Sequence, residues 1–193
     1  MIVLARHGQT EWNKVKRLQG CKNSPLTGLG EEQAFYVAKK INELVGNSEL
    51  NLVSSPLGRA LDTAKVIASE LGKSDNYIKI DVLLREYSFG DWEGDTFKQI
   101  KQKYSEQWDS RQADKWNYVV PGGESYSILA RRAEKWLLNL PDNIITVAVS
   151  HQMIGQVIRG IYLGLDERQT LMNSQQNNEI ILLENGSERI VKA

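Results

Sequence analysis

The stretch MIVLARHGQTEWN, residues 1–13, contains an apolar run that stops at Arg6, His7 and Gly8 and gives way to polar residues. Five apolar residues in succession, Met1 to Ala5, are typical of a strand that is covered on both faces in a parallel sheet. Ligands of open α/β sheets bind at the carboxyl ends of such strands. The stretch therefore predicts a strand followed by a ligand-binding loop.

A second apolar run, Ile144 to Val149, ends in the same way, at Ser150 and His151. The chain has two histidines, and each of them follows an apolar run of this kind. Either histidine alone is open to a purely structural interpretation, because buried polar side chains are often just satisfied within the core. Taken together, His7 and His151 indicate a shared site at one edge of the sheet.

Helix and strand patterns alternate along the rest of the chain. Apolar residues recur at three- and four-residue intervals in four predicted helices, at 27–45, from Ser54-Ser55-Pro56 to 71, at 126–137 and at 152–163. Further strands are predicted at 50–53, within 78–84, at 179–184 and near 190–191, and a polar helical excursion is predicted at 98–116. This alternation predicts an α/β fold, a three-layer α/β/α sandwich with a mostly parallel central sheet.

Ser54-Ser55-Pro56 predicts the start of a helix, with a serine as the N-cap and proline in or near the first turn. Arg59 then lies near a helix N-terminus, where free backbone N–H groups and the helix dipole favour an anion. The alternative is a solvated arginine that pairs with Asp62. The position favours a role in binding.

Glu86 opens an acidic, aromatic and glycine-containing loop, residues 85–94, directly after the predicted strand at 78–84. A carboxyl group at this place is expected to project into the same crevice as His7. The alternative is an ion pair of Glu86 with Arg85 or with a lysine, and the stretch alone does not decide between the two interpretations.

The composition limits the class of protein. Lys plus Arg and Asp plus Glu both number 24 in 193 residues, so the net charge of +0 gives no support for a nucleic-acid or membrane partner. The lone Cys21 cannot form an internal disulfide and no Cys/His cluster has zinc spacing, which favours a reducing, cytoplasmic location. No secretory signal or membrane span is predicted, and we expect one domain, residues 1–193.

Five of these residues form a set that suits a phosphate ester: Arg6, His7, Arg59, Glu86 and His151. Two arginines can neutralise the nonbridging oxygens, and one imidazole can attack phosphorus. The other imidazole can donate hydrogen bonds to developing charge, while a carboxylic acid protonates the leaving alcohol.

Arg6-His7-Gly8-Gln9-Thr10 resembles the RHG motif of the histidine phosphatase superfamily, also called the phosphoglycerate mutase-like superfamily. Further segments look like family motifs in family order: Trp12-Asn13, Leu26-Thr27 to Gly30, Ser54-Ser55-Pro56 with Arg59 and Ala60, Leu84 to Glu86 with Gly90 and Trp92-Glu93-Gly94, Gly122-Gly123-Glu124-Ser125 and Val149-Ser150-His151. The resemblance spans most of the chain and implies the phosphoglycerate mutase-like fold and the small phosphatase branch.

The resemblance implies a role for each of the five residues. His7 becomes phosphorylated, and Arg6, Arg59 and His151 line the phosphate pocket. Glu86 acts as proton donor and then as proton acceptor. Family members need no metal ion, so none is expected here, and no cofactor is expected for the phosphatase reaction.

Four further positions match family pocket residues. Asn13 matches a phosphate ligand, and Gln19 and Gly20 fall where family members line the substrate side. Gln152 departs from the glycine that many relatives have after the second histidine. Its backbone N–H can still donate, but we expect its side chain to narrow the pocket and so to affect substrate size.

The leading hypothesis is a metal-independent phosphomonoester hydrolase that acts on a small phosphorylated metabolite. One alternative is a cofactor-dependent phosphoglycerate mutase, although such relatives carry longer insertions with more basic residues than 98–116. Another is a non-catalytic phospho-ligand binding module, which the intact His7 and Glu86 argue against. The substrates left open are α-ribazole phosphate, sugar phosphates, phosphoglycerates and a broad range of esters; the oligomeric state is not predicted.

Overall fold

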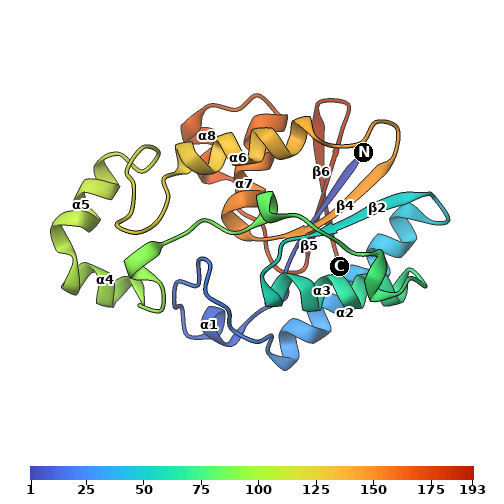
Figure 1. Cartoon of the computed structure of the whole chain (residues 1–193), viewed down its shortest axis with the longest axis horizontal. Coiled ribbons are helices and arrows are strands. Elements are labelled where there is room, and N and C mark those ends of the chain that lie inside the picture. The colour runs from blue at the N-terminus through green and yellow to red at the C-terminus, as the bar shows by residue number, and fades with distance from the viewer.

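The computed structural model describes residues 1–193 and contains one six-stranded sheet in the order β3-β2-β4-β1-β5-β6 (Figure 1). The strands are β1 (Ile2–Arg6), β2 (Leu50–Ser54), β3 (Lys79–Ile80), β4 (Ile145–Ser150), β5 (Glu179–Glu184) and β6 (Ser187–Lys192). Strands β3, β2, β4 and β1 are parallel to one another, whereas β5 and β6 are antiparallel to their neighbours. The predicted, mostly parallel sheet is confirmed.

Helices cover both faces of this sheet. They are α1 (Glu11–Lys14), α2 (Gly28–Val45), α3 (Gly58–Glu70), α4 (Phe97–Lys103), α5 (Ser105–Ala113), α6 (Tyr126–Leu138), α7 (Gln152–Tyr162) and α8 (Glu167–Met172). Three short 3₁₀ turns are η1 (Asp75–Tyr77), η2 (Val82–Leu84) and η3 (Gly90–Trp92). Figure 1 shows α2 and α3 below the sheet, α6 and α7 above it, and α4 with α5 projecting from one end. None of the helices has the length and apolar character needed to cross a membrane.

The side chains of β1 show why residues 2–5 are all apolar. Ile2 and Leu4 pack in the cluster that contains the apolar residues of α6 and α7. Val3 and Ala5 pack in the second cluster, with those of α2 and α3. Because successive side chains of a strand point to opposite faces, a strand between two helical layers needs apolar residues at every position. The three-layer sandwich is therefore confirmed.

The weak strand predicted within 78–84 is present but short. Only Lys79–Ile80 pairs with β2, and the chain then turns into η2. The turn begins at Asp81, whose side chain accepts a hydrogen bond from the backbone N–H of Leu83 at 2.9 Å. A side chain that satisfies a backbone donor in this way competes with strand pairing.

The predicted serine N-cap of α3 is wrong. The N-cap position is Leu57, which makes no side-chain capping bond. Ser55 lies outside the helix, and its Oγ accepts the N–H of Leu57 at 3.3 Å. Asn23, from a distant loop, supplies a cap instead, because its Oδ1 accepts the N–H of Arg59 at 3.2 Å.

The loop after β1 lies directly against the first turn of α2. Thr27 caps this helix as predicted, accepting the N–H of Gly30 at 3.0 Å. A Cβ on Gly30 would lie 2.0 Å from the carbonyl oxygen of Gln9, and one on Gly8 would lie 2.1 Å from that of Gly30. Two backbones therefore touch where any side chain would separate them.

Replacing Gly30 with Ala should destabilise the protein by about 1–3 kcal/mol, because the added methyl group forces α2 away from the loop. Gly28→Ala is the matched control in the same helical turn, since nothing lies within 4 Å of its Cβ position. It should be neutral or stabilise by up to about 1 kcal/mol. Urea unfolding of both variants measures the difference, and equal stability of the two would contradict the close approach.

Candidate active site

The parallel pairing of β1 with β4 brings the two histidines together. Arg6 and Ser150 are register partners, and the N–H of His7 donates to the carbonyl of Ser150 at 3.1 Å. The imidazoles of His7 and His151 lie with ring centroids 5.1 Å apart and planes tilted by 57°. His7 is 3% exposed and His151 is 0% exposed.

A cavity of about 150 Å³ opens at this edge of the sheet. Its lining contains eight residues expected from the sequence, namely Arg6, His7, Asn13, Gln19, Gly20, Arg59, Glu86 and Gln152. Arg17, Leu18, Phe89 and Met153 also line it. Of the predicted set, His151 alone is not in the lining, since it is fully buried beside His7.

His7 is held as a neutral imidazole with a defined tautomer. Its Nδ1 lies 2.7 Å from the carbonyl oxygen of Gly8, which can only accept, so the ring proton is on Nδ1. Burial lowers the pKa of His7 well below its ordinary value of 6.5, and the charges of Arg59 and Arg6 lower it further. The lone pair is therefore on Nε2, where Arg59 Nε donates a hydrogen bond at 3.2 Å.

Arg59 is 1% exposed, so the alternative of a solvated arginine is wrong. Its two terminal nitrogens donate to the carbonyls of Gly20 and Lys22, both at 2.8 Å. Glu93 holds this turn in place, because its carboxylate accepts the N–H of Cys21 at 2.8 Å and that of Lys22 at 3.1 Å. Gly20 has a φ of +52°, and a Cβ there would lie 2.0 Å from Glu93 Oε1.

Arg6 is held by residues from the other end of the chain. One terminal nitrogen donates to Gln152 Oε1 at 3.1 Å and to the carbonyl of Gln175 at 2.8 Å. Gln152 Oε1 also accepts the N–H of Gln175 at 3.2 Å. The side chain of Gln152 thus lines the cavity and also fixes Arg6, a role that sequence reasoning did not identify.

The connection between α8 and β5, residues 173–178, was also missed. Besides Gln175, it contributes Asn177, whose Nδ2 donates to the carbonyl of His7 at 2.6 Å. Its sequence, NSQQNN, offers no signal beyond a run of polar residues of the kind that usually forms a surface loop. Only the fold reveals that it supports the loop after β1.

Glu86 is fixed at the N-terminus of α7. Its Oε1 accepts the N–H of Tyr87 at 3.0 Å and those of Met153 and Ile154 at 3.1 Å each. Glu86 is 7% exposed and lines the cavity. The free N–H groups of a helix start favour an anion, so this contact anchors the carboxylate.

Arg132 on α6 holds the backbone that carries Glu86. Its guanidinium donates to the carbonyls of Leu83, Arg85 and Glu86. It also pairs with Glu124 at 3.0 Å. The sequence around Arg132 does not indicate this role, because each of these hydrogen bonds joins Arg132 to a residue at least eight positions away.

Asn13 lies in the short helix α1. Its Oδ1 accepts the N–H of Thr10 at 3.1 Å, while Thr10 Oγ1 accepts the N–H of Asn13 at 3.2 Å. This capping box uses the amide oxygen of Asn13. The NH₂ group of the same side chain is therefore free to donate a hydrogen bond into the cavity.

The charges of the cavity favour a dianion. Arg6, Arg17 and Arg59 contribute three positive charges to the lining, against the single carboxylate of Glu86. None of these arginines forms an ion pair within the protein. No group of three or more His, Cys, Asp or Glu side chains is arranged to hold a metal ion.

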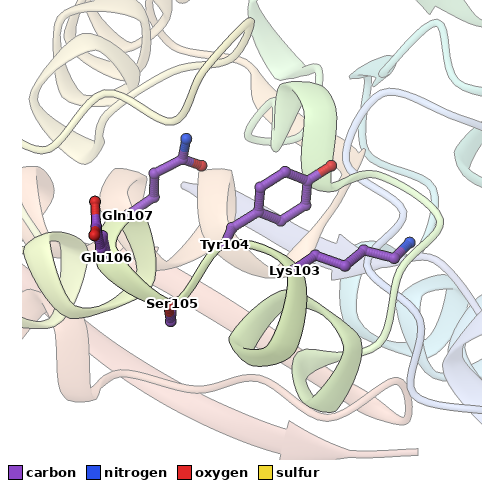
Figure 2. Close-up of a pocket in the computed structure, with 5 residues that line it drawn as sticks. All are labelled: Lys103, Tyr104, Ser105, Glu106 and Gln107. Atoms are coloured by element: carbon purple, nitrogen blue, oxygen red, sulfur yellow. The ribbon is translucent and has the colours of Figure 1, made fainter.

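A separate hollow of about 190 Å³ lies at the junction of α4 and α5, lined by residues 103–107 (Figure 2). Figure 2 shows the side chains of Lys103 and Glu106 directed away from each other. The lining contains no histidine or arginine. The hollow therefore has neither of these side chains, whereas the cavity at the ends of β1 and β4 contains both.

Residues 2–192 match the family model described as the histidine phosphatase superfamily (branch 1). The chain belongs to the histidine phosphatase superfamily. The family expected from the ordered motifs is therefore confirmed over nearly the whole sequence. The chain is an enzyme of this superfamily, with its characteristic α/β fold.

Named relatives and solved structures agree with this assignment. The probable phosphoglycerate mutase GpmB of Erwinia tasmaniensis is 35% identical over 168 residues, which cover 85% of this chain and 75% of that protein. The α-ribazole phosphatase of Shigella flexneri has the same fold, with a TM-score of 0.83, 24% identity and coverage of 100% of this chain and 96% of the other. A mycobacterial glucosyl-3-phosphoglycerate phosphatase, solved with VO3, has a TM-score of 0.78, 26% identity and coverage of 93% and 88%.

Two buried neutral histidines should make the protein sensitive to acid. The pKa of each is lowered by burial, so below pH 6.5 the unfolded chain binds protons that the folded one does not. Stability is complete above that pH and should fall as pH drops, with a slope approaching about 2.7 kcal/mol per pH unit for two groups. Denaturant unfolding between pH 7.5 and 5.5 measures it.

His7→Gln should remove about half of this slope, because it leaves one of the two histidines. Comparison of slopes, not of absolute stabilities, separates the titration from any packing defect in the variant. The same slope in the wild type and the variant would contradict the buried, neutral state of His7.

Proposed function

We propose that this protein is a metal-independent phosphomonoester hydrolase that forms a phosphohistidine on His7. The observation that supports this most directly is the hydrogen bond from His7 Nδ1 to the carbonyl of Gly8 at 2.7 Å, which leaves the lone pair on Nε2. A neutral imidazole with its reactive nitrogen beside a guanidinium is suited to attack on an anionic ester.

In the first step, Nε2 of His7 forms a bond to phosphorus as the bond from phosphorus to the ester oxygen breaks. Glu86, in its acid form, gives its proton to the leaving oxygen. The Nε–H of Arg59 that now contacts Nε2 turns to a nonbridging oxygen of the phosphoryl group. Arg6 and the NH₂ group of Asn13 bind the other phosphoryl oxygens.

In the second step, water attacks phosphorus and the bond to Nε2 breaks, which restores neutral His7. The Glu86 carboxylate accepts the proton from the attacking water, so the acid is regenerated. Both roles require the carboxyl group to stay at one place, and the N–H groups of α7 and the clamp by Arg132 support this.

The substrate is proposed to be a small phosphorylated metabolite, with the phosphoryl group between the arginines and the alcohol part on the side of Gln19 and Gly20. Gln152 lines the same cavity. A single domain over 1–193 and a cytoplasmic location remain predictions from the sequence, and neither affects the chemistry.

A phosphoglycerate mutase is the second candidate, because relatives 34–35% identical carry that name. A mutase needs a phosphoenzyme that survives until it transfers its phosphoryl group to a second substrate molecule. Incubation of 3-phosphoglycerate with bisphosphoglycerate separates the two: a phosphatase releases inorganic phosphate, whereas a mutase yields 2-phosphoglycerate. A binding module would do neither.

The primary test is phosphate release from an aryl phosphate in EDTA, with wild type and His7→Ala compared. The wild type should remain active in EDTA, and the variant should lose at least about 10⁴-fold in kcat/KM because no second nucleophile lies at the end of β1. Substantial activity in the variant would refute the phosphohistidine mechanism. An inactive wild type would contradict the phosphatase and leave the mutase and the binding module, which the assay with bisphosphoglycerate separates.

Glu86→Gln should slow the phosphorylation step by about 10²–10⁴-fold for alkyl phosphates and far less for aryl phosphates. The difference arises because a good aryl leaving group departs without protonation. Single-turnover kinetics isolate this step from the later attack by water. Asp95→Asn is a control, since this carboxylate pairs with Lys103 at 2.9 Å outside the cavity. Equal losses for both ester classes would argue against Glu86 as the acid.

A further inference from the structure

One polar atom of the histidine pair has no hydrogen-bond partner. His151 Nδ1 is buried and unpartnered, whereas its Nε2 lies 2.7 Å from Ser55 Oγ. Both side chains are 0% exposed, so neither can use water as a partner. The position of the ring proton therefore decides whether Nδ1 is a donor or an acceptor.

The hydrogen bonds of Ser55 determine that position. Ser55 Oγ already accepts the N–H of Leu57 at 3.3 Å. If His151 Nε2 carried the proton, it would also donate to this oxygen, and the buried hydroxyl proton of Ser55 would have no acceptor. If Ser55 donates to Nε2 instead, every group is satisfied except one N–H, at Nδ1. The second arrangement leaves fewer buried groups unpaired and is favoured.

His151 carries only one ring proton, so only one of its two ring nitrogens can donate a hydrogen bond. Burial lowers the pKa of His151 well below its ordinary value of 6.5, and the charges of Arg59, His7 and Arg6 lower it further. A neutral imidazole with Nε2 accepting from Ser55 has its proton on Nδ1.

We propose that Ser55 is a positioning residue that donates its hydroxyl proton to His151 Nε2 and so fixes the His151 proton on Nδ1, ready to donate to the transferred phosphoryl group. The phosphoryl oxygens supply the acceptor that Nδ1 lacks, next to an imidazole whose centroid lies 5.1 Å away. This inference rests on the proposed function for its kinetic consequence but not for the tautomer itself.

Each of the two histidines then carries its ring proton on Nδ1, but one ring acts as a nucleophile and the other as a hydrogen-bond donor. In His7, the Gly8 carbonyl accepts from Nδ1 and leaves Nε2 as the nucleophile. In His151, Ser55 occupies Nε2 and leaves Nδ1–H as the donor.

The tautomers can be read directly from two-bond ¹H–¹⁵N correlation spectra of the ¹⁵N-labelled full chain. The chain has only two histidines, and His7→Gln assigns the signals by leaving one imidazole. We expect both rings of the wild type to show the Nδ1–H pattern. An Nε2–H pattern for His151 in the wild type would overturn the proposal without any need for a serine variant.

Ser55→Ala should convert His151 to the Nε2–H form or to a mixture, while the pattern of His7 stays unchanged. Ser54→Ala is the matched control, because Ser54 is equally buried and its Oγ donates only to the carbonyl of Ser55. Ser55→Thr, which keeps the hydroxyl, should retain the wild-type pattern. A Ser55→Ala protein with His151 still wholly in the Nδ1–H form would overturn the assignment.

In kinetics, Ser55→Ala should lower kcat by roughly 10- to 100-fold with a smaller change in KM, whereas Ser54→Ala should stay within about threefold. A converted tautomer with unchanged kcat would overturn the part of the proposal that concerns the phosphoryl group. Absence of turnover in the wild type would contradict the proposed function instead, and the spectra would still decide the role of Ser55.

Discussion

The candidate site depends on the parallel pairing of β1 with β4. This register places Arg6 beside Ser150, and the next residue of each strand is a histidine. Since β2 also pairs with β4 in parallel, β2 ends at the same edge of the sheet, and Ser55 is the residue that follows it. Three segments from distant parts of the sequence therefore meet because their strands all end on one side of the sheet.

The charged groups of the site are held by uncharged groups, mostly backbone atoms, and not by one another. Carbonyls of Gly20 and Lys22 hold Arg59, and the carbonyl of Gln175 holds Arg6. Backbone N–H groups hold Glu86. A buried arginine that paired with a carboxylate would have its charge neutralised before a substrate arrived. Fixation by peptide dipoles keeps the positive charge available for a phosphoryl group.

The features that depend on neighbouring residues in the sequence could be predicted. The apolar run of β1 and the histidines after two strands predicted the sheet and its functional edge, and Arg59 was correctly placed near a helix start. Ser55 shows the limit of such reasoning, because a serine before a helix usually caps it, whereas here its hydroxyl contacts His151, 96 residues away. Arg132 and Gln175 were missed for the same reason. The guanidinium of Arg132 donates to the carbonyl of Glu86, and the carbonyl of Gln175 accepts from Arg6, so each hydrogen bond joins residues that only the folded chain brings together.

The claim on which the rest of the account depends is that His7 carries the phosphoryl group during turnover. The most direct test is to mix Glu86→Gln with an aryl phosphate, quench it in alkaline denaturant within milliseconds to seconds, and locate the modification by peptide mass spectrometry. We expect one phosphoryl group on the peptide that contains His7, attached to the imidazole. A phosphoryl group on another residue, or product formed with no phosphoenzyme at any time, would contradict it.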